Sequence, residues 1–244
     1  FTEQFEAALP KRPASMQWSL SRLDPPDAPT EEQASALLRC VVRDTDPALV
    51  GRSFTSTAVE LALASFPGFT MTAPPGNGSP YGVFEPGYVD AAEVEHRVAF
   101  ASGVVELIEP SPLRGRPAAD EPVDYVAAVS DWGPTRRVPL GIVAGARSGD
   151  KGGSANIGVW VRDREQFDWL HSTLDVELLR TLLPETAELT VHRYSLPNLL
   201  AVNFVIEGIL GRGVADNVRF DPQAKGLGEW LRSRHVDVPE RFLG

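Results

Sequence analysis

Apolar residues recur with helical spacing in two segments of the first part of the chain. Thr30 is a suitable N-cap before acidic residues, and apolar residues follow at 34, 37, 38, 41 and 42. A helix is therefore predicted to begin at Thr30 and to end before Pro47. A second helix is predicted over residues 55–65, where a Pro-Gly pair ends the pattern.

The next segment has the pattern of a loop followed by a hairpin. Residues 73–87 are rich in proline and glycine and predict a long loop. Residues 94–100 alternate between apolar and polar, which predicts a strand. Ala101, Ser102 and Gly103 can turn the chain into a second strand over residues 104–109.

The last hundred residues are more regular. Strands are predicted over 139–146, 155–161, 189–194 and 199–206, with a buried helix as the alternative for 199–206. One helix is predicted over 163–171, with Thr173 capping a continuation to Leu183, and a final helix from Asp221 to about Arg234. The order ββαββα predicts an α+β sandwich in which two helices cover one face of an antiparallel or mixed sheet.

Proline and charge are both unevenly distributed. The chain has 21 prolines, and 15 of them lie in residues 1–122. We therefore expect three parts: an irregular Pro/Gly-rich α/β segment over 1–110, a linker over 111–138 and a regular domain over 139–244. The net charge of −10 comes mostly from residues 1–110, which carry 7 basic and 15 acidic residues.

This composition excludes several classes of protein. Nucleic-acid binding normally requires a basic face, and no run of Lys or Arg is longer than two residues. No apolar stretch reaches the ~20 residues that a membrane helix needs. A single cysteine, Cys40, favours a reducing compartment, so we expect a cytoplasmic protein that binds neither nucleic acid nor membranes.

Candidate chemistry is concentrated between Arg147 and Asn156. Arg147, Ser148, Asp150, Lys151 and Asn156 supply charges, donors and acceptors, while Gly149, Gly152 and Gly153 allow tight turns. We interpret residues 147–153 as a glycine-rich loop that could form an anion site. The alternative is a tight turn between two strands with solvated charges, since neither GxxxxGK[ST] nor GxGxxG is present.

Three polar residues outside this loop are also candidates. Asn198 follows Pro197, and Asn203 lies inside an apolar run where its amide needs a partner, either in a structural hydrogen bond or at a ligand. Lys225 is one of only three lysines, and its alternative is a solvated residue on a capped helix. The four histidines have no metal-ligand spacing, so neither a metal nor a cofactor is expected.

Several strings resemble one family. Arg147–Gly152 with Ala155–Gly158, then Leu196–Phe204, then Asp221–Gly226 resemble the C-terminal domain of the acyclic terpene utilisation (AtuA-like) family. Further upstream, Val50–Arg52, Glu60–Ser65 and Phe66–Phe69 resemble the end of the region that precedes this domain in the family. The resemblance covers about residues 35–243.

The resemblance implies a ferredoxin-like fold for the C-terminal domain and a part in the bacterial breakdown of acyclic isoprenoids, such as citronellol and geraniol, through CoA thioesters. The family also has a long glycine-rich N-terminal region, which this sequence lacks. Its loop usually reads Gly-Asp-Lys-Gly-Asp, whereas here Gly153 replaces the last acid.

We therefore expect a protein that acts on an isoprenoid or related acyl-CoA or carboxylate, with hydratase, hydrolase or lyase chemistry. The alternative is a non-catalytic accessory or interaction subunit of a larger acyl-CoA-metabolising enzyme. A homo-oligomer, or a companion chain with the N-terminal region, is the expected assembly. Asp150 and Lys151 are the predicted catalytic residues, and the predicted substrate-binding residues are Arg147, Ser148, Gly149, Gly152, Asn156, Asn198, Asn203 and Lys225.

Overall fold

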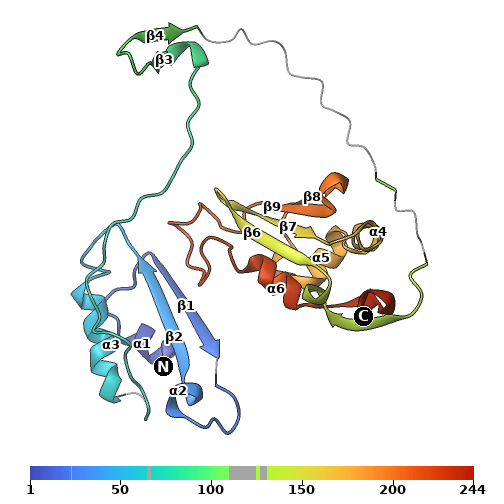
Figure 1. Cartoon of the computed structure of the whole chain (residues 1–244). Helices are drawn as coiled ribbons and strands as arrows, with labels where there is room; N and C mark the ends of the chain where they lie inside the picture. The colour runs from blue at the N-terminus through green and yellow to red at the C-terminus, as the bar shows by residue number, and fades with distance from the viewer. Residues whose placement is uncertain (23, 65–66, 110–124, 127–130) are drawn as a thin grey trace. The chain divides into compact units, whose positions relative to one another are not determined.

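A computed structural model describes residues 1–22, 24–64, 67–109, 125–126 and 131–244. In these residues the chain has mixed α/β structure, with antiparallel sheets and six α-helices (Figure 1). It divides into two compact units, residues 1–82 and 83–244.

The first unit is a two-stranded sheet with three helices. β1 (Ser15–Arg22) pairs with β2 (Ala36–Arg43) in antiparallel fashion along its whole length. Helices α1 (Thr2–Ala8), α2 (Glu31–Ala34) and α3 (Arg52–Ala64) complete the unit. The ring of Phe5 is buried, with its centroid 5.4 Å from that of Trp18 and 5.1 Å from that of Phe54. These rings supply an apolar centre to a unit that is otherwise rich in polar residues.

The helix predicted from Thr30 to before Pro47 is wrong beyond its first turn. Thr30 does cap a helix, because its hydroxyl accepts a hydrogen bond from the N–H of Gln33, but α2 is only four residues long. Ser35 is extended, and its hydroxyl donates to the carbonyl of Glu31. The following apolar residues, including the β-branched Val41 and Val42, then pair with β1. Pairing with β1 satisfies the backbone groups along one edge of residues 36–43, and this pairing overrides the helical spacing.

The other predictions for residues 52–109 are confirmed. Helix α3 begins three residues before the predicted start, and no helix or strand occurs over 73–87. β3 (His96–Ala99) and β4 (Val105–Ile108) form the expected hairpin, in which Gly103 has a φ of 85°. Most of the predicted linker over 111–138 lies outside the described residues.

The C-terminal part contains a four-stranded antiparallel sheet. Its strands are β6 (Gly145–Lys151), β7 (Ser154–Trp160), β8 (Val191–Leu196) and β9 (Ala201–Ile206), in the order β6-β7-β9-β8. The helices are α4 (Arg164–Thr173), α5 (Val176–Leu182) and α6 (Leu227–Ser233). The predicted order ββαββα is found for this sheet when α4 and α5 are counted as one helical segment, although its first strand is β6 rather than the predicted 139–146. The usual ferredoxin-like order is βαββαβ. If its last strand is moved to the front, the order becomes ββαββα.

A smaller sheet was not predicted. β5 (Thr135–Pro139) pairs with β10 (His235–Pro239), so the two ends of the C-terminal part lie side by side. The predicted strand over 139–146 is wrong, because Pro139 ends β5 and a 3₁₀ helix follows over Leu140–Ile142. The remaining 3₁₀ helices are Ala91–Glu93, Pro184–Thr186, Pro197–Leu199 and Glu240–Phe242.

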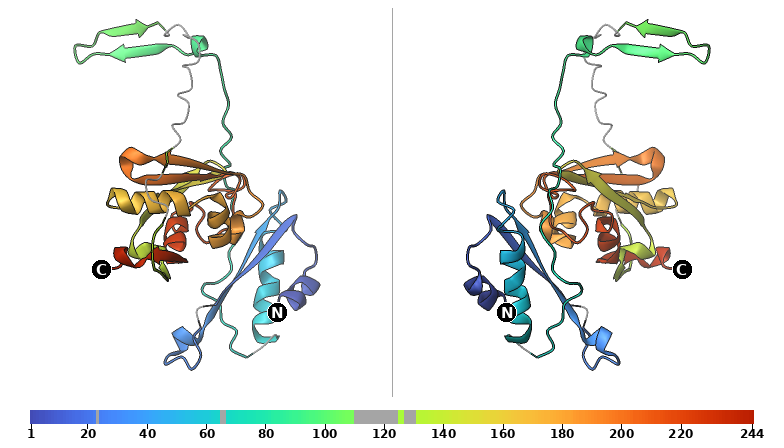
Figure 2. Two further views of the ribbon diagram at one scale, coloured as in Figure 1. Left: turned by 90° about the vertical axis from the view of Figure 1, so that its right-hand side faces the viewer. Right: turned by 90° about the vertical axis from the view of Figure 1, so that its left-hand side faces the viewer.

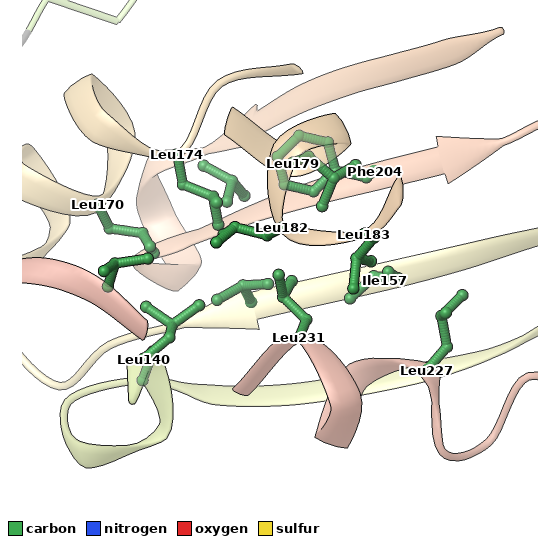
Figure 3. Close-up of a cluster of buried hydrophobic side chains, with 14 of the residues drawn as sticks. Leu140, Ile157, Leu170, Leu174, Leu179, Leu182, Leu183, Phe204, Leu227 and Leu231 are labelled. Carbon is green, nitrogen blue, oxygen red and sulfur yellow. The ribbon is translucent and has the colours of Figure 1, made fainter. Parts of the chain in front are cut away.

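The core lies between this sheet and its helices. Ala155, Ile157 and Val159 of β7 and Val202, Phe204 and Ile206 of β9 all have no exposed surface. Leucines of α4, α5 and α6 point toward Ile157 and Phe204 (Figure 3). All three helices therefore cover one face of the sheet, where two were predicted (Figure 2). The alternate residues of β7 and β9 face the other side.

Two helix starts differ from the prediction. Asp175, rather than Thr173, caps α5, because its carboxylate accepts a hydrogen bond from the N–H of Leu178. The final helix begins at Leu227 rather than at Asp221. The carboxylate of Asp221 accepts hydrogen bonds from Lys225 and Gly226, which holds residues 221–226 in a turn.

Ser148 fastens α6 to the sheet. It is buried, and its hydroxyl donates to the carbonyl of Ala224 at 2.6 Å and accepts from the N–H of Gly228 at 2.7 Å. A Cβ on Gly228 would lie 3.3 Å from this hydroxyl, so glycine permits the close approach. The contact satisfies one of the N–H groups at the start of α6 that have no partner within the helix.

We expect Phe204→Ala to destabilise the protein by about 3–5 kcal/mol, because it removes a fully buried ring and leaves a cavity. Val205→Ala, one residue along on the half-buried opposite face, is the matched control and should cost less than about 1 kcal/mol. Urea unfolding followed by far-UV circular dichroism measures both. Equal losses would contradict the assignment of the two faces.

We expect Ser148→Ala to cost about 1–3 kcal/mol, because it leaves the N–H of Gly228 buried without its acceptor. Ser195→Ala is the matched control. The hydroxyl of Ser195 is buried and has no hydrogen-bond partner in the described structure, so removing it should be neutral or stabilising. The same urea titration compares them, and a neutral Ser148→Ala would refute this role.

Candidate functional site

The face of the four-stranded sheet opposite the helices displays three rows of residues in register. Arg147 and Lys151 are exposed there, and Asn156 and Asn203 are half-buried. Three apolar side chains of this face are also exposed: Trp160 at 43%, Tyr194 at 51% and Leu196 at 38%. The rows are Gly145–Trp160–Ala201–Leu196, Arg147–Gly158–Asn203–Tyr194 and Gly149–Asn156–Val205–His192.

The predicted glycine-rich loop over 147–153 is wrong as a loop, because residues 147–151 belong to strand β6. They pair with residues 154–158 of β7, which satisfies backbone groups that an anion-binding loop would leave free. Only Gly152 and Gly153 remain as the two-residue turn of the hairpin, and Gly152 has a φ of 63°. The pairing therefore removes the loop-type anion site, and side chains become the main candidates for binding an anion here.

Gly153 has a steric explanation. A Cβ at this position would lie 2.1 Å from the carbonyl oxygen of Gly211, and the carbonyl of Gly153 accepts a hydrogen bond from the N–H of Leu210 at 2.9 Å. A carboxylate side chain therefore does not fit here without a shift of the backbone near Gly211.

Arg147 and Asn203 flank a gap in the exposed face. Gly158 lies between them in register, and a Cβ there would have no atom closer than 3.8 Å. The guanidinium of Arg147 makes no hydrogen bond or ion pair with any residue that the structure describes. Asn203 uses its amide oxygen to accept from the amide nitrogen of Asn156 at 3.2 Å. This contact is the structural hydrogen bond considered for Asn203, and within the described residues it leaves the amide nitrogen of Asn203 without a hydrogen bond.

Asp150 and Lys225 meet at the edge of β6. The ammonium of Lys225 lies 3.4 Å from a carboxylate oxygen of Asp150. It also lies 3.0 Å from the position that a Cβ on Gly149 would occupy, so glycine leaves room for it. Lys151 donates to the backbone carbonyl of Asp150 at 3.2 Å. These contacts bring Gly149, Asp150, Lys151 and Lys225 together.

A strained turn positions Lys225. Ala224 is buried and has a φ of 53°, in the left-handed region that residues with a Cβ seldom adopt. Such a conformation costs about 1 kcal/mol or more and persists only where its surroundings enforce it. Ser148, which binds the carbonyl of Ala224, and Asp221, which binds the N–H of Lys225, supply those contacts. The side chain of Lys225 therefore extends from a rigid turn. This turn precedes α6, whereas the sequence predicted Lys225 inside the final helix.

The electrostatic setting keeps Asp150 ionised. The pKa of Asp150 lies below the ordinary value of an aspartate. The largest cause is a hydrogen bond from its own backbone N–H, and the second is a hydrogen bond from the ammonium of Lys225. General acid–base catalysis works best when the pKa lies near the working pH. At neutral pH Asp150 is therefore better suited to hold a cation than to transfer a proton.

The predicted site residues do not all converge. Asn198 lies in the connection between β8 and β9, beyond the row that contains Trp160 and Leu196. Five residues along a strand separate that row from Asp150, which is about 17 Å. Ser148 is on the helix-covered face, where its hydroxyl is already occupied. The catalytic and binding roles assigned from the sequence stay predictions.

Sequence reasoning missed the two aromatic residues of the exposed face, Trp160 and Tyr194. Alternation along the predicted strands 155–161 and 189–194 could have placed them opposite the core residues. Gly145 also indicates the position of Trp160, but this can be recognised only from the structure. A Cβ there would lie 2.5 Å from the indole of Trp160, so the ring packs directly on the glycine backbone.

Two further findings concern metals and membranes. Among the described residues, no three His, Cys, Asp or Glu side chains gather in a way that could hold a metal ion. In the same part of the chain, no helix has the length and apolar character needed to span a bilayer.

Two family models match the chain. Residues 1–100 match the acyclic terpene utilisation family protein AtuA, and residues 138–237 match the AtuA ferredoxin-like domain. No curated protein and no solved structure matches. The family match suggests a function related to acyclic terpene utilisation, without a specific substrate or activity. The chain is an AtuA-like protein with a ferredoxin-like domain.

Proposed function

We propose that the exposed sheet face beside β6 binds the anionic group of an isoprenoid or related acyl-CoA or carboxylate ligand. This proposal is carried by the observation that the guanidinium of Arg147 has no partner among the described residues. Arg147 lies in register with Gly158 and Asn203. Family membership supports the substrate class.

The chemistry of this face suits such a ligand. Arg147 can bind a carboxylate or phosphate through two parallel hydrogen bonds, which are stronger than those between neutral groups. The amide nitrogen of Asn203 can add a donor from across the gap at Gly158. Tyr194 lies in the same row and Trp160 in the next, so aromatic surface is available for a hydrocarbon chain or for the adenine ring of a CoA-type group.

Lys225 and Lys151 add positive charge near Gly149. In this arrangement the carboxylate of Asp150 orients Lys225, while Lys151 extends from the strand end. Any hydratase, hydrolase or lyase chemistry would act on a ligand held by these cations. The catalytic assignments of Asp150 and Lys151 remain part of the proposal.

A second candidate function is an interaction subunit of a larger acyl-CoA-metabolising enzyme. It is favoured by the exposure of Trp160, Tyr194 and Leu196 on one sheet face, since such patches often mark protein interfaces. Sedimentation velocity at several concentrations, with and without ligand, separates the two. A stable complex with a co-purifying chain that buries Trp160 would favour the subunit.

We expect Arg147→Ala to weaken binding of a C10 isoprenoid acyl-CoA by about tenfold to a hundredfold, because it removes hydrogen bonds to a charged group. Arg147→Lys should recover only part of the loss, and Lys151→Ala should weaken binding less. Arg136→Ala, at an exposed position on β5, is the matched control. Isothermal titration calorimetry measures all four variants, and equal affinities for Arg147→Ala and wild type would rule out this site.

We expect Lys225→Met to raise the pKa of Asp150 toward its ordinary value, while the backbone hydrogen bond keeps it somewhat lowered. A lowered carboxylate pKa stabilises the fold at pH values above the ordinary pKa, and this contribution is lost as the pH falls through the lowered value. Carbon-13 NMR titration of the Asp150 carboxylate in both proteins measures the change. An unchanged pKa would show that the two groups are not coupled.

A further inference from the structure

The ferredoxin-like domain contains a pocket of about 550 Å³ where β6 begins and β7 ends. Its walls are the turn over residues 141–146, Trp160, Arg162, Gln166, Arg232 and Phe242. The volume lies within the range of about 300–1,000 Å³ that small-molecule sites occupy. It shares Trp160 with the face to which we assign the proposed function, whereas Arg147, Asn203 and Lys225 do not line it.

One wall of the pocket is built by Arg232 of α6. Its Nε donates to the carbonyl of Ala144 at 3.0 Å and a terminal nitrogen donates to that of Gly141 at 3.3 Å. Its other terminal nitrogen pairs with Glu229 at 2.7 Å. All three nitrogens of the Arg232 guanidinium are thus hydrogen-bonded and its charge is balanced by Glu229. We therefore assign Arg232 a structural role, in which it holds the turn over residues 141–146.

A second wall is apolar and partly exposed. The indole of Trp160 packs on the backbone of Gly145, yet 43% of the residue stays accessible. Ile142, which also lines the pocket, is 58% exposed. Phe242 is held by edge-on packing against Trp169, with the ring centroids 6.1 Å apart. The pocket therefore offers apolar surface that is fixed in place before any ligand arrives.

Two other polar side chains of the pocket, Gln166 and Arg162, have unused donors. The side-chain oxygen of Gln166 accepts a hydrogen bond from the backbone N–H of Arg162 at 3.2 Å, which leaves the amide nitrogen of Gln166 to donate. Within the described residues, the guanidinium of Arg162 makes neither a hydrogen bond nor an ion pair. The neighbouring carboxylates are engaged elsewhere, since Asp163 caps α4 and Glu165 pairs with Arg241 at 3.0 Å.

We propose that this pocket binds an amphipathic monocarboxylate. Arg162 holds the carboxylate through its two parallel N–H groups, and the amide of Gln166 donates a further hydrogen bond. Trp160, Ile142 and Phe242 contact the apolar body of the ligand. Of the two arginines that line the pocket, Arg232 pairs with Glu229, whereas Arg162 has no carboxylate partner among the described residues, so a single negative charge on the ligand would balance it.

A series of straight-chain carboxylates tests the proposal on the full chain by isothermal titration calorimetry. Octanoate should bind, and each methylene removed through hexanoate and butanoate should weaken binding by up to about fourfold, because less apolar surface is buried. Octanamide has the same chain without the charge and should bind at least about tenfold more weakly than octanoate.

Arg162→Gln should weaken octanoate binding by about tenfold or more, and Arg162→Lys should recover part of it. Arg136→Gln is the matched control. Because Arg147 does not line the pocket, Arg162→Gln should cause the same loss in an Arg147→Ala background, which separates this proposal from the proposed function. The indole N–H resonance of Trp160, assigned with Trp160→Phe, should shift when octanoate is added to the wild type. Equal octanoate affinities for wild type and Arg162→Gln, or an unmoved Trp160 resonance, would overturn the proposal.

Discussion

The alternation of side chains along β7 is the constraint on which the C-terminal part depends. Ala155, Ile157 and Val159 have no exposed surface, and Asn156, Gly158 and Trp160 lie between them on the opposite face. Because successive side chains of a strand point to opposite faces, the burial of one set determines where the other must go. A shift of one residue in register would expose Ile157 and bury Asn156. The packing that stabilises the core therefore also fixes the polar face on which Arg147 and Asn203 meet across Gly158.

Three glycines of the β6–β7 hairpin determine how closely other residues can approach its backbone. Gly145 accepts the indole of Trp160 and Gly149 leaves room for the ammonium of Lys225. Gly153 approaches the backbone of Gly211 more closely than any side chain would allow. Each contact joins residues that are distant in sequence, so these glycines are needed for packing and not for a flexible loop. This explains how a glycine-rich, polar segment can be a regular strand.

The sequence allowed most of the order of strands and helices along the C-terminal part to be predicted, but not the contacts at the edge of its sheet. The apolar runs over 155–161 and 199–206 were predicted as strands, with a buried helix as the alternative for the second, and the structure has strands in both. Residues 147–153 carry few apolar side chains, so their strand depends on pairing with β7, which spacing alone does not reveal. Likewise, Leu37, Leu38, Val41 and Val42 fit a helix, and only the distant β1 makes them a strand. The contact between Lys225 and Asp150 depends on the left-handed turn at Ala224, for which the sequence gives no signal.

Most charged side chains of the ferredoxin-like domain could be paired, so the arginines that have no ion pair are informative. Residues 139–244 carry 12 basic and 14 acidic residues, so carboxylates are available to neutralise every arginine and lysine. Many are neutralised, as in the pairs Arg180–Glu177, Arg219–Glu185, Arg232–Glu229 and Arg241–Glu165. Arg147 and Arg162 stay unpaired in the described structure, and both lie beside fixed apolar surface and an amide donor. An exposed arginine alone is ordinary, because water solvates it well. An arginine next to preorganised partners in an acid-rich domain instead matches the charge and shape of an anionic, partly apolar ligand.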